Sequence, residues 1–152
     1  SKPGSAWARP TRAAERESVL HPGDPALRLT ITRVRYEYAS SGILDGPART
    51  SILENCRSQL AASSERDPDA ARLAFLVEKA LNPEGAYPAL ERLVRLDPAR
   101  GARWLRERVE LDFSLGRHAA VARSLKERRA EALADASGDR DWHAAVLWWT
   151  DG

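Results

Sequence analysis

The sequence predicts an all-α fold, and three observations carry this prediction. Alanine, the best helix former, supplies 26 of the 152 residues, whereas the β-branched residues Val, Ile and Thr together supply 15. Short turn signals that contain Pro or Gly recur along the chain. The stretches between these signals are amphipathic with a helical period. A chain of this length buries enough surface to fold without a disulfide or a metal.

Residues 1–23 differ in composition from the remainder of the chain. They contain five Pro or Gly residues and scattered Arg and Ser, and their largest apolar side chains are Trp7 and the pair Val19-Leu20. Such a segment has too little apolar surface to offset the entropy lost on folding. We therefore expect a flexible N-terminal arm or linker over 1–23 and a helical-repeat domain over 24–152.

Several of the predicted helices begin at a shared signal, an Asp or Asn followed by Pro. The Asp or Asn side chain accepts hydrogen bonds from free N–H groups of the first turn, and Pro at the first position loses an N–H that has no partner there. Asp24-Pro25, Asp67-Pro68 and Asp97-Pro98 carry the acidic form, and Asn82-Pro83 carries the amide form. Gly46-Pro47 predicts a fifth start.

Seven helices are predicted between these signals, over residues 25–41, 47–62, 68–81, 85–96, 98–115, 117–135 and 140–150. The first contains residues 29–32, Leu-Thr-Ile-Thr, which alternate as a strand does. A longer helical stripe formed by Leu27, Ile31, Val34 and Tyr38 favours the helix. The connections are short, so sequential helices are expected to run antiparallel.

The internal helices have apolar side chains on more than one face. In 98–115, for example, Leu105, Val109 and Phe113 are expected to face away from Trp104 and Leu111. A helix that is apolar on two faces is packed between neighbours. The chain is therefore expected to form about three stacked antiparallel hairpins plus a C-terminal helix.

One sequence pattern recurs at an offset of 31 residues. Residues 85–90 (GAYPAL) and 116–121 (GRHAAV) share a Gly, a ring two positions later, and an Ala followed by an apolar residue. Gly116, like Gly42, lies where a helix end requires a positive φ. With the segment LVRLDP over 93–98, this pattern resembles the tetratricopeptide-like helical repeats in a degenerate form. The resemblance implies a protein-binding role in which the first helix of each hairpin lines a concave surface.

Basic residues form short stripes on the first helix of each predicted hairpin. Their spacing of three or seven residues places the members of each pair on one face. If they line the surface that the resemblance implies, the groove is basic and suits an acidic segment of a protein partner. The alternative is that they are solvated faces balanced by neighbouring Glu residues. The pairs are Arg28 with Arg35, Arg72 with Lys79, and Arg103 with Arg106.

Three tryptophans crowd the last predicted helix. Trp148 and Trp149 are adjacent and so point to different faces, and Trp142 lies seven residues before Trp149. Tryptophan is enriched at the centres of protein interfaces because it buries a large rigid area. One reading is that the indoles seal the last hairpin, and the other is that they contact a partner.

The sequence holds no recognisable catalytic, nucleotide or metal motif, and we expect neither a cofactor nor a metal. Glycine-rich phosphate loops and zinc-ligand spacings are absent. The single thiol, Cys56, is expected to be a small buried side chain, and His118 a ring that closes a turn. Acidic pairs such as Asp139 with Asp141 and Glu107 with Glu110 are expected to be helix caps and ion pairs.

We therefore predict a non-catalytic protein-interaction or scaffold module. The alternatives are a nucleic-acid or anionic-surface binding domain and an accessory fragment of a larger enzyme. A net charge of +2 weighs against nucleic-acid binding, because phosphate affinity grows with the number of basic contacts.

Composition also bears on origin and compartment. Arginine accounts for 21 of the 24 basic residues, which together with the Ala content indicates a bacterial coding bias. No apolar run approaches the length of a membrane span, and the cytoplasm and periplasm both remain open. The chain contains no Met, so we expect a processed product or a piece of a longer protein.

Overall fold

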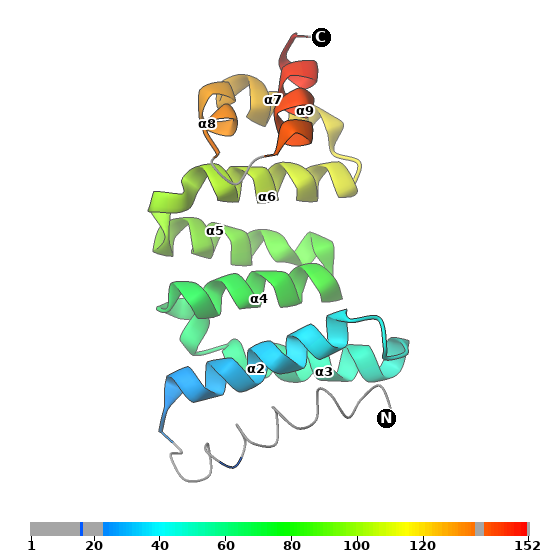
Figure 1. Cartoon of the computed structure of the whole chain (residues 1–152), viewed down its shortest axis with the longest axis vertical. Coiled ribbons are helices and arrows are strands. Elements are labelled where there is room, and N and C mark those ends of the chain that lie inside the picture. The colour runs from blue at the N-terminus through cyan, green and yellow to red at the C-terminus, as the bar shows by residue number, and fades with distance from the viewer. Residues whose placement is uncertain (1–15, 17–22, 136–138, 152) are drawn as a thin grey trace. The chain divides into compact units, whose positions relative to one another are not determined.

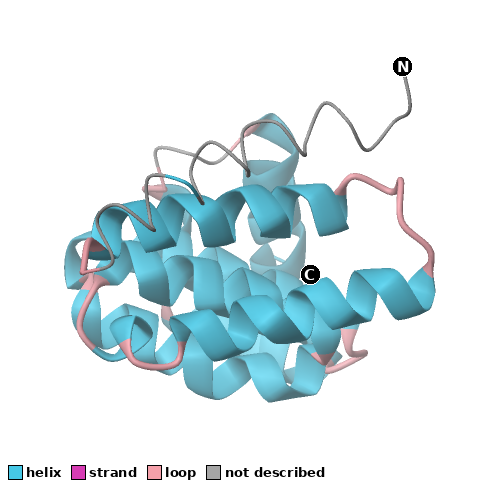
Figure 2. Ribbon diagram, turned by 90° about the horizontal axis from the view of Figure 1, so that it is seen from below, coloured by secondary structure: helices cyan, strands magenta, loops and turns pink. Residues whose placement is uncertain are grey.

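The computed structural model describes residues 16, 23–135 and 139–151, and it is helical throughout these parts. Every element in the described ranges is an α-helix or a short 3-10 helix (Figures 1 and 2). The predicted all-α class is therefore confirmed. The predicted arm, with Trp7 and Val19-Leu20, lies outside the described residues. Within the described part of the chain, no helix combines the length and the apolar character needed to cross a membrane.

The chain divides into two compact units, residues 1–89 and 90–152, and the boundary falls within one helix. In the first unit α2 and α3 form a hairpin, and α4 packs against α3 and, less extensively, against α2 (Figure 1). Its elements are α2 (Pro25–Ser40), α3 (Gly46–Leu60), η1 (Ser63–Glu65), α4 (Pro68–Leu81) and η2 (Pro83–Ala86). Helix α5 (Tyr87–Leu96) contains the boundary.

The second unit is built around a hairpin of two helices that is closed by two more. Helix α6 packs against α7 and α8, and α9 packs against α7 and α8. The elements are η3 (Pro98–Arg100), α6 (Gly101–Ser114), α7 (His118–Glu127), α8 (Arg129–Leu133) and α9 (Arg140–Asp151). The predicted helix bounds agree with the structure to within a few residues, except in 85–86, 98–100 and 117–135.

The Asp-Pro signal acts as a helix cap at only some of its positions. Asp24 Oδ1 accepts the N–H groups of Ala26 and Leu27 at 3.0 and 3.3 Å. Asp67 caps α4 in the same way, with Oδ1 3.0 Å from the N atom of Asp69. Asn82 and Asp97 make no side-chain cap bond, and each precedes a 3-10 turn. The prediction that one device starts four helices is therefore wrong for these two.

Helix α2 is continuous through the residues that alternate like a strand. Ile31 and Ala39 are buried in it, and Thr32 is tolerated because its Oγ1 donates to the carbonyl of Arg28 at 2.9 Å. The core of the first unit lies between α2, α3 and α4, where Cys56 and Leu60 meet residues of α4. The α4 residues in this cluster are Ala70, Leu73 and Val77.

The prediction of one continuous helix over 117–135 is wrong, because the helix is interrupted at Arg128. This residue has φ −124° and ψ 33°, and α8 begins immediately after it. The break lets Ala132 enter the core of the second unit, and its carbonyl accepts a hydrogen bond from Nε1 of Trp142 at 2.9 Å. Trp142 lies outside the segment 117–135, so the helical period of that segment does not indicate the interruption at Arg128.

The two copies of the recurring pattern differ in conformation. Gly116 has φ +73° and ends α6, as predicted, and Gly42 has φ +82°. Gly85 lies inside η2 and is not among the positive-φ residues of the described chain. Leu125 is buried, whereas its counterpart Val94 is 44% exposed. The shared residues therefore mark a helix end with a left-handed glycine in one copy only, at Gly116.

Candidate binding site

A hollow of about 400 Å³ opens on the second unit between α6, α7 and α9. Its floor is formed by Val109, Val121, Leu125 and Trp142, which are also members of the hydrophobic core. Ala145 and Trp149 line the side contributed by α9. Its volume falls in the range of about 300–1,000 Å³ that is usual for ligand sites. The hollow therefore gives a ligand direct access to apolar core side chains.

The position of α9 determines the shape of this hollow. Oδ1 of Asp139 accepts the backbone N–H of Trp142 at 2.8 Å and so caps the helix. At the far end, Nε of Arg129 donates to Oγ1 of Thr150 at 3.1 Å. The bond from Arg129 to Thr150 and the bond from Trp142 to Ala132 join α8 to α9 at both ends of α9.

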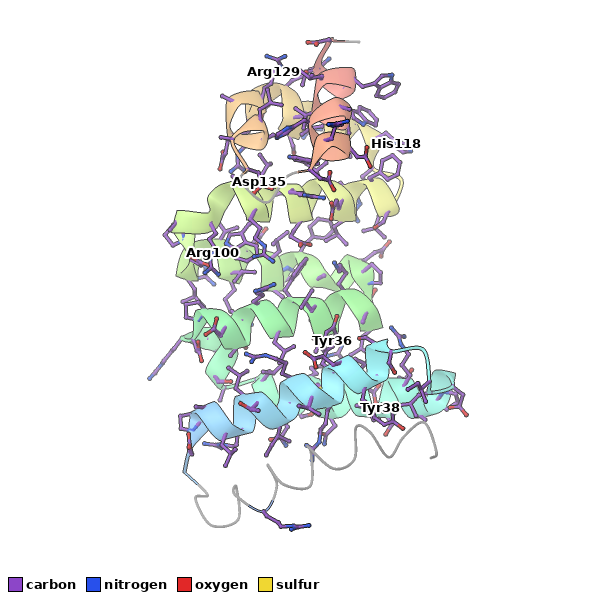
Figure 3. The ribbon with its side chains drawn as sticks, in the orientation of Figure 1. Tyr36, Tyr38, Arg100, His118, Arg129 and Asp135 are labelled. Atoms are coloured by element: carbon purple, nitrogen blue, oxygen red, sulfur yellow. The ribbon has the colours of Figure 1, made fainter. Side chains whose placement is uncertain are left out.

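An aromatic row runs beside the hollow from α6 to α9. The ring of Phe113 meets that of His118 edge-on at 5.4 Å between centroids, and His118 stacks on Trp149 at 6.0 Å. Figure 3 labels His118, the first residue of α7. Trp148 meets Trp149 edge-on at 5.1 Å. Phe113 is 56% exposed and Trp148 is 70% exposed. Phe113 therefore shares a face of α6 with Val109, as predicted, but it is not packed between neighbouring helices as that prediction expected.

Four charged residues surround the apolar floor. Nε of Arg106 donates to Oε1 of Glu110 at 2.9 Å, and its Nη2 lies 3.8 Å from Oδ2 of Asp139. The hydrogen bond to Glu110 and the nearby carboxylates raise the pKa of Arg106 above its usual range. The guanidinium also lies 5.4 Å from the ring centroid of Trp142. Asp141, in the first turn of α9, completes the rim.

The three candidate tryptophans have different environments. Trp142 is buried and hydrogen-bonded, so it seals the second unit, as one of the two predicted readings requires. Trp149 is partly buried against the core and lines the hollow, whereas Trp148 projects from α9. A terminal helix with adjacent indoles therefore keeps one of them accessible to a partner.

The other predicted basic residues lie at several separate places. Arg72 lines a hollow of about 270 Å³ between α2 and α4, together with Arg33 and the carboxylates of Glu37 and Asp69. Cations and carboxylates are equal in number there, which fits the alternative of balanced, solvated faces. Arg28 lines a different hollow, of about 440 Å³, which also contains Arg66 and Glu65.

The remaining basic candidates contact neighbouring side chains. Nη1 of Arg35 donates to Oδ1 of Asn55 at 3.3 Å. Nζ of Lys79 lies 5.4 Å from the ring centroid of Phe75, and the guanidinium of Arg103 lies 5.6 Å from that of Trp104. Arg35 and Lys79 belong to the first unit and Arg103 to the second. A single basic groove through all six residues stays a prediction.

Cys56 is the small buried side chain that the sequence predicts. It is fully buried, and its Sγ donates weakly to the carbonyl of Thr32 at 3.7 Å. Burial raises the pKa of its thiol to about 11, which keeps it protonated and unreactive at neutral pH. No cluster of three or more His, Cys, Asp or Glu side chains able to hold a metal occurs within residues 23–135 and 139–151.

Two residues of the site were missed as binding residues at the sequence level. Phe113 has the spacing of a core position, and His118 matches Tyr87 in the recurring pattern. Phe113 contacts His118, and His118 meets Trp149 only because α9 packs against α7, which brings together residues more than 30 positions apart. No local signal in the sequence identifies this partner.

Comparisons with known proteins leave the function to be inferred from the site itself. No protein-family model, no curated protein and no solved structure matches this chain. The resemblance to tetratricopeptide-like repeats therefore stays a prediction, and the geometry of the hollow is the basis on which a function can be proposed.

Proposed function

We propose that this chain is a non-catalytic protein-interaction module whose second unit binds an apolar segment of a protein partner in the hollow between α6, α7 and α9. One observation carries this proposal: Phe113, a large apolar side chain, lines the hollow and is 56% exposed. Trp148, at the other end of the aromatic row, is also exposed. Exposed aromatic side chains around an apolar depression are typical of interaction sites.

The arrangement of the helices supports the same reading. Helix α6 is the first helix of its hairpin and supplies Arg106, Val109, Glu110 and Phe113 to the hollow. In the repeat family that the sequence resembles, the first helices line the binding surface. The degenerate tetratricopeptide-like assignment is part of the proposal for this reason.

The proposal is tested by peptide binding to the full chain. Random dodecapeptides displayed on phage are selected on the wild-type protein, and a fluorescein-labelled selected peptide is titrated while its anisotropy is measured. Phe113→Ser removes the exposed ring, and Ala145→Trp fills the hollow. Burying a phenylalanine contributes roughly 1.5–3 kcal/mol, so Phe113→Ser should weaken binding at least about tenfold. Ala145→Trp should weaken binding at least as much, because its indole occupies the space that the ligand needs.

Val94→Ser is the matched control, because Val94 is an exposed apolar residue of the same unit and does not line the hollow. It should bind the peptide as the wild type does, with all variants retaining the far-UV circular dichroism of the wild type. Equal peptide affinity for wild type and Ala145→Trp would refute the site. Tight binding of random single-stranded DNA, unchanged in Ala145→Trp, would support the nucleic-acid alternative instead.

A further inference from the structure

The charges around the hollow indicate what kind of segment it accepts. Its lining contains three carboxylates, from Glu110, Asp139 and Asp141, and one guanidinium, from Arg106. The lining therefore carries a surplus of two negative charges. This surplus stands at the edge of an apolar floor, where water screens charges less than it does in bulk solvent.

Arg106 does not present its charge to an incoming ligand. Its guanidinium is hydrogen-bonded to Glu110, lies within ion-pair distance of Asp139, and is positioned over the ring of Trp142. Asp139 remains 64% exposed despite its contact with Arg106. Asp141 is exposed, and no ion pair is found for it within the described ranges. The negative charges are thus more accessible than the positive one.

The aromatic walls favour the same sign of ligand charge. A guanidinium or ammonium group is attracted to the face of an aromatic ring within about 6 Å of its centroid. Arg106 already makes such a contact with Trp142 inside the hollow. Trp149 and Phe113 line the same hollow and offer further rings next to the carboxylates.

Building on the proposed function, we infer that the occupant is a basic amphipathic segment of a protein partner. Its apolar side chains would contact Val109, Val121 and Leu125, and its Lys or Arg side chains would lie against Asp139 and Asp141. An acidic segment, which the basic stripes suggested from sequence, would meet the surplus of carboxylates here and be repelled.

The test uses selected peptides and charge variants of the full chain. Peptides enriched from a phage library of random dodecapeptides should combine apolar or aromatic residues with a net positive charge. Asp141→Asn removes one carboxylate, and Asp141→Lys reverses it. Binding of an enriched peptide should weaken several-fold in the first variant and at least about tenfold in the second. Binding should also weaken when salt is raised from roughly 0.05 M to 0.5 M.

Glu127→Lys is the matched charge control, because Glu127 is exposed on α7 and does not line the hollow. It makes the same change in net charge and should leave affinity within about twofold of wild type. Equal losses in Asp141→Lys and Glu127→Lys would show only a long-range effect of net charge and would overturn the inference.

The remaining outcomes separate this inference from the proposed function. If acidic peptides are enriched and Ala145→Trp abolishes their binding, the inference of a basic segment is overturned, but the proposed interaction site is supported. Enriched peptides that bind Ala145→Trp as tightly as wild type would overturn both. Self-association in sedimentation equilibrium, lost in Ala145→Trp, would make a second copy of this chain the occupant and so contradict the inference.

Discussion

Gly116 is the residue at which the chain turns from α6 into α7. Its φ of +73° allows the N–H of Arg117 to bond the carbonyl of Asp112 at 2.8 Å and its own N–H to bond that of Phe113 at 3.0 Å. These two bonds form the Schellman motif that satisfies carbonyls at a helix end. The conformation positions His118 next to Phe113, so one glycine links the turn to the aromatic row.

Replacement of Gly116 by Ala should therefore destabilise the protein although no atom lies within 4 Å of the added Cβ. A left-handed conformation costs a residue with a side chain about 1 kcal/mol. Gly46→Ala is the control, since that position is equally open and has no positive φ. Urea unfolding should show a lower free energy of unfolding for Gly116→Ala only. Equal effects of the two substitutions would argue against strain at the turn.

Cys56 illustrates how burial controls the chemistry of one residue. Its thiol has a pKa of about 11 in the folded chain, against 9.0 when unperturbed. The folded state therefore binds its proton more tightly than the unfolded state. The resulting stabilisation is fully present below pH 9 and is lost as the pH rises towards 11.

The free energy of unfolding should accordingly fall faster for wild type than for Cys56→Ala between pH 9 and 10.5, by up to about 1.4 kcal/mol per pH unit. The variant provides the baseline because every other titrating group is unchanged. Urea denaturation at a series of pH values measures the difference. A difference that stays constant over this range would show that the thiol is not shielded as the structure indicates.

At the scale of elements, the capping signal has two outcomes that sequence alone does not distinguish. Asp67 accepts a backbone N–H of α4, whereas Asp97 begins a 3-10 turn without such a bond. Asp67→Ala should cost about 1 kcal/mol of stability, and Asp97→Ala, which removes no cap bond and only a 3.6 Å ion pair with the exposed Arg100, should cost less than half of that. Thermal unfolding of the two variants provides the comparison, and a larger effect at Asp97 would contradict it.

The docking of α9 depends on the indole of Trp142. Replacement by Phe keeps the ring but leaves the carbonyl of Ala132 without its donor, which should cost roughly 1–3 kcal/mol because that carbonyl is buried. Trp148→Phe is the matched control, since Trp148 is 70% exposed. Chemical unfolding should show a large loss only for Trp142→Phe, and similar losses for both would mean that the hydrogen bond adds no stability.

At the scale of the whole molecule, local patterns predicted the helices and non-local packing produced the site. The helical class, most helix ends and the buried Cys56 follow from composition, caps and the 3.6-residue period. The break at Arg128 and the exposure of Phe113 do not, because each depends on where α9 packs. The sequence pointed to Trp149 through its neighbours in α9, and to Arg106 as part of a basic stripe. The helical period could not predict that Trp149 and Arg106 line one hollow with three carboxylates, because this depends on contacts between helices.

The most direct measurement of the central claim uses the indole N–H signals of the five tryptophans as position-specific reporters. A ¹H–¹⁵N spectrum of the full chain is recorded during titration with a selected peptide, and the signals are assigned through single Trp→Phe variants. The signals of Trp142 and Trp149 should shift, because both line the hollow, while that of Trp104, bonded to the carbonyl of Asp97, should stay in place. A saturating titration that moves the signal of Trp104 and leaves Trp149 unchanged would contradict the proposed site.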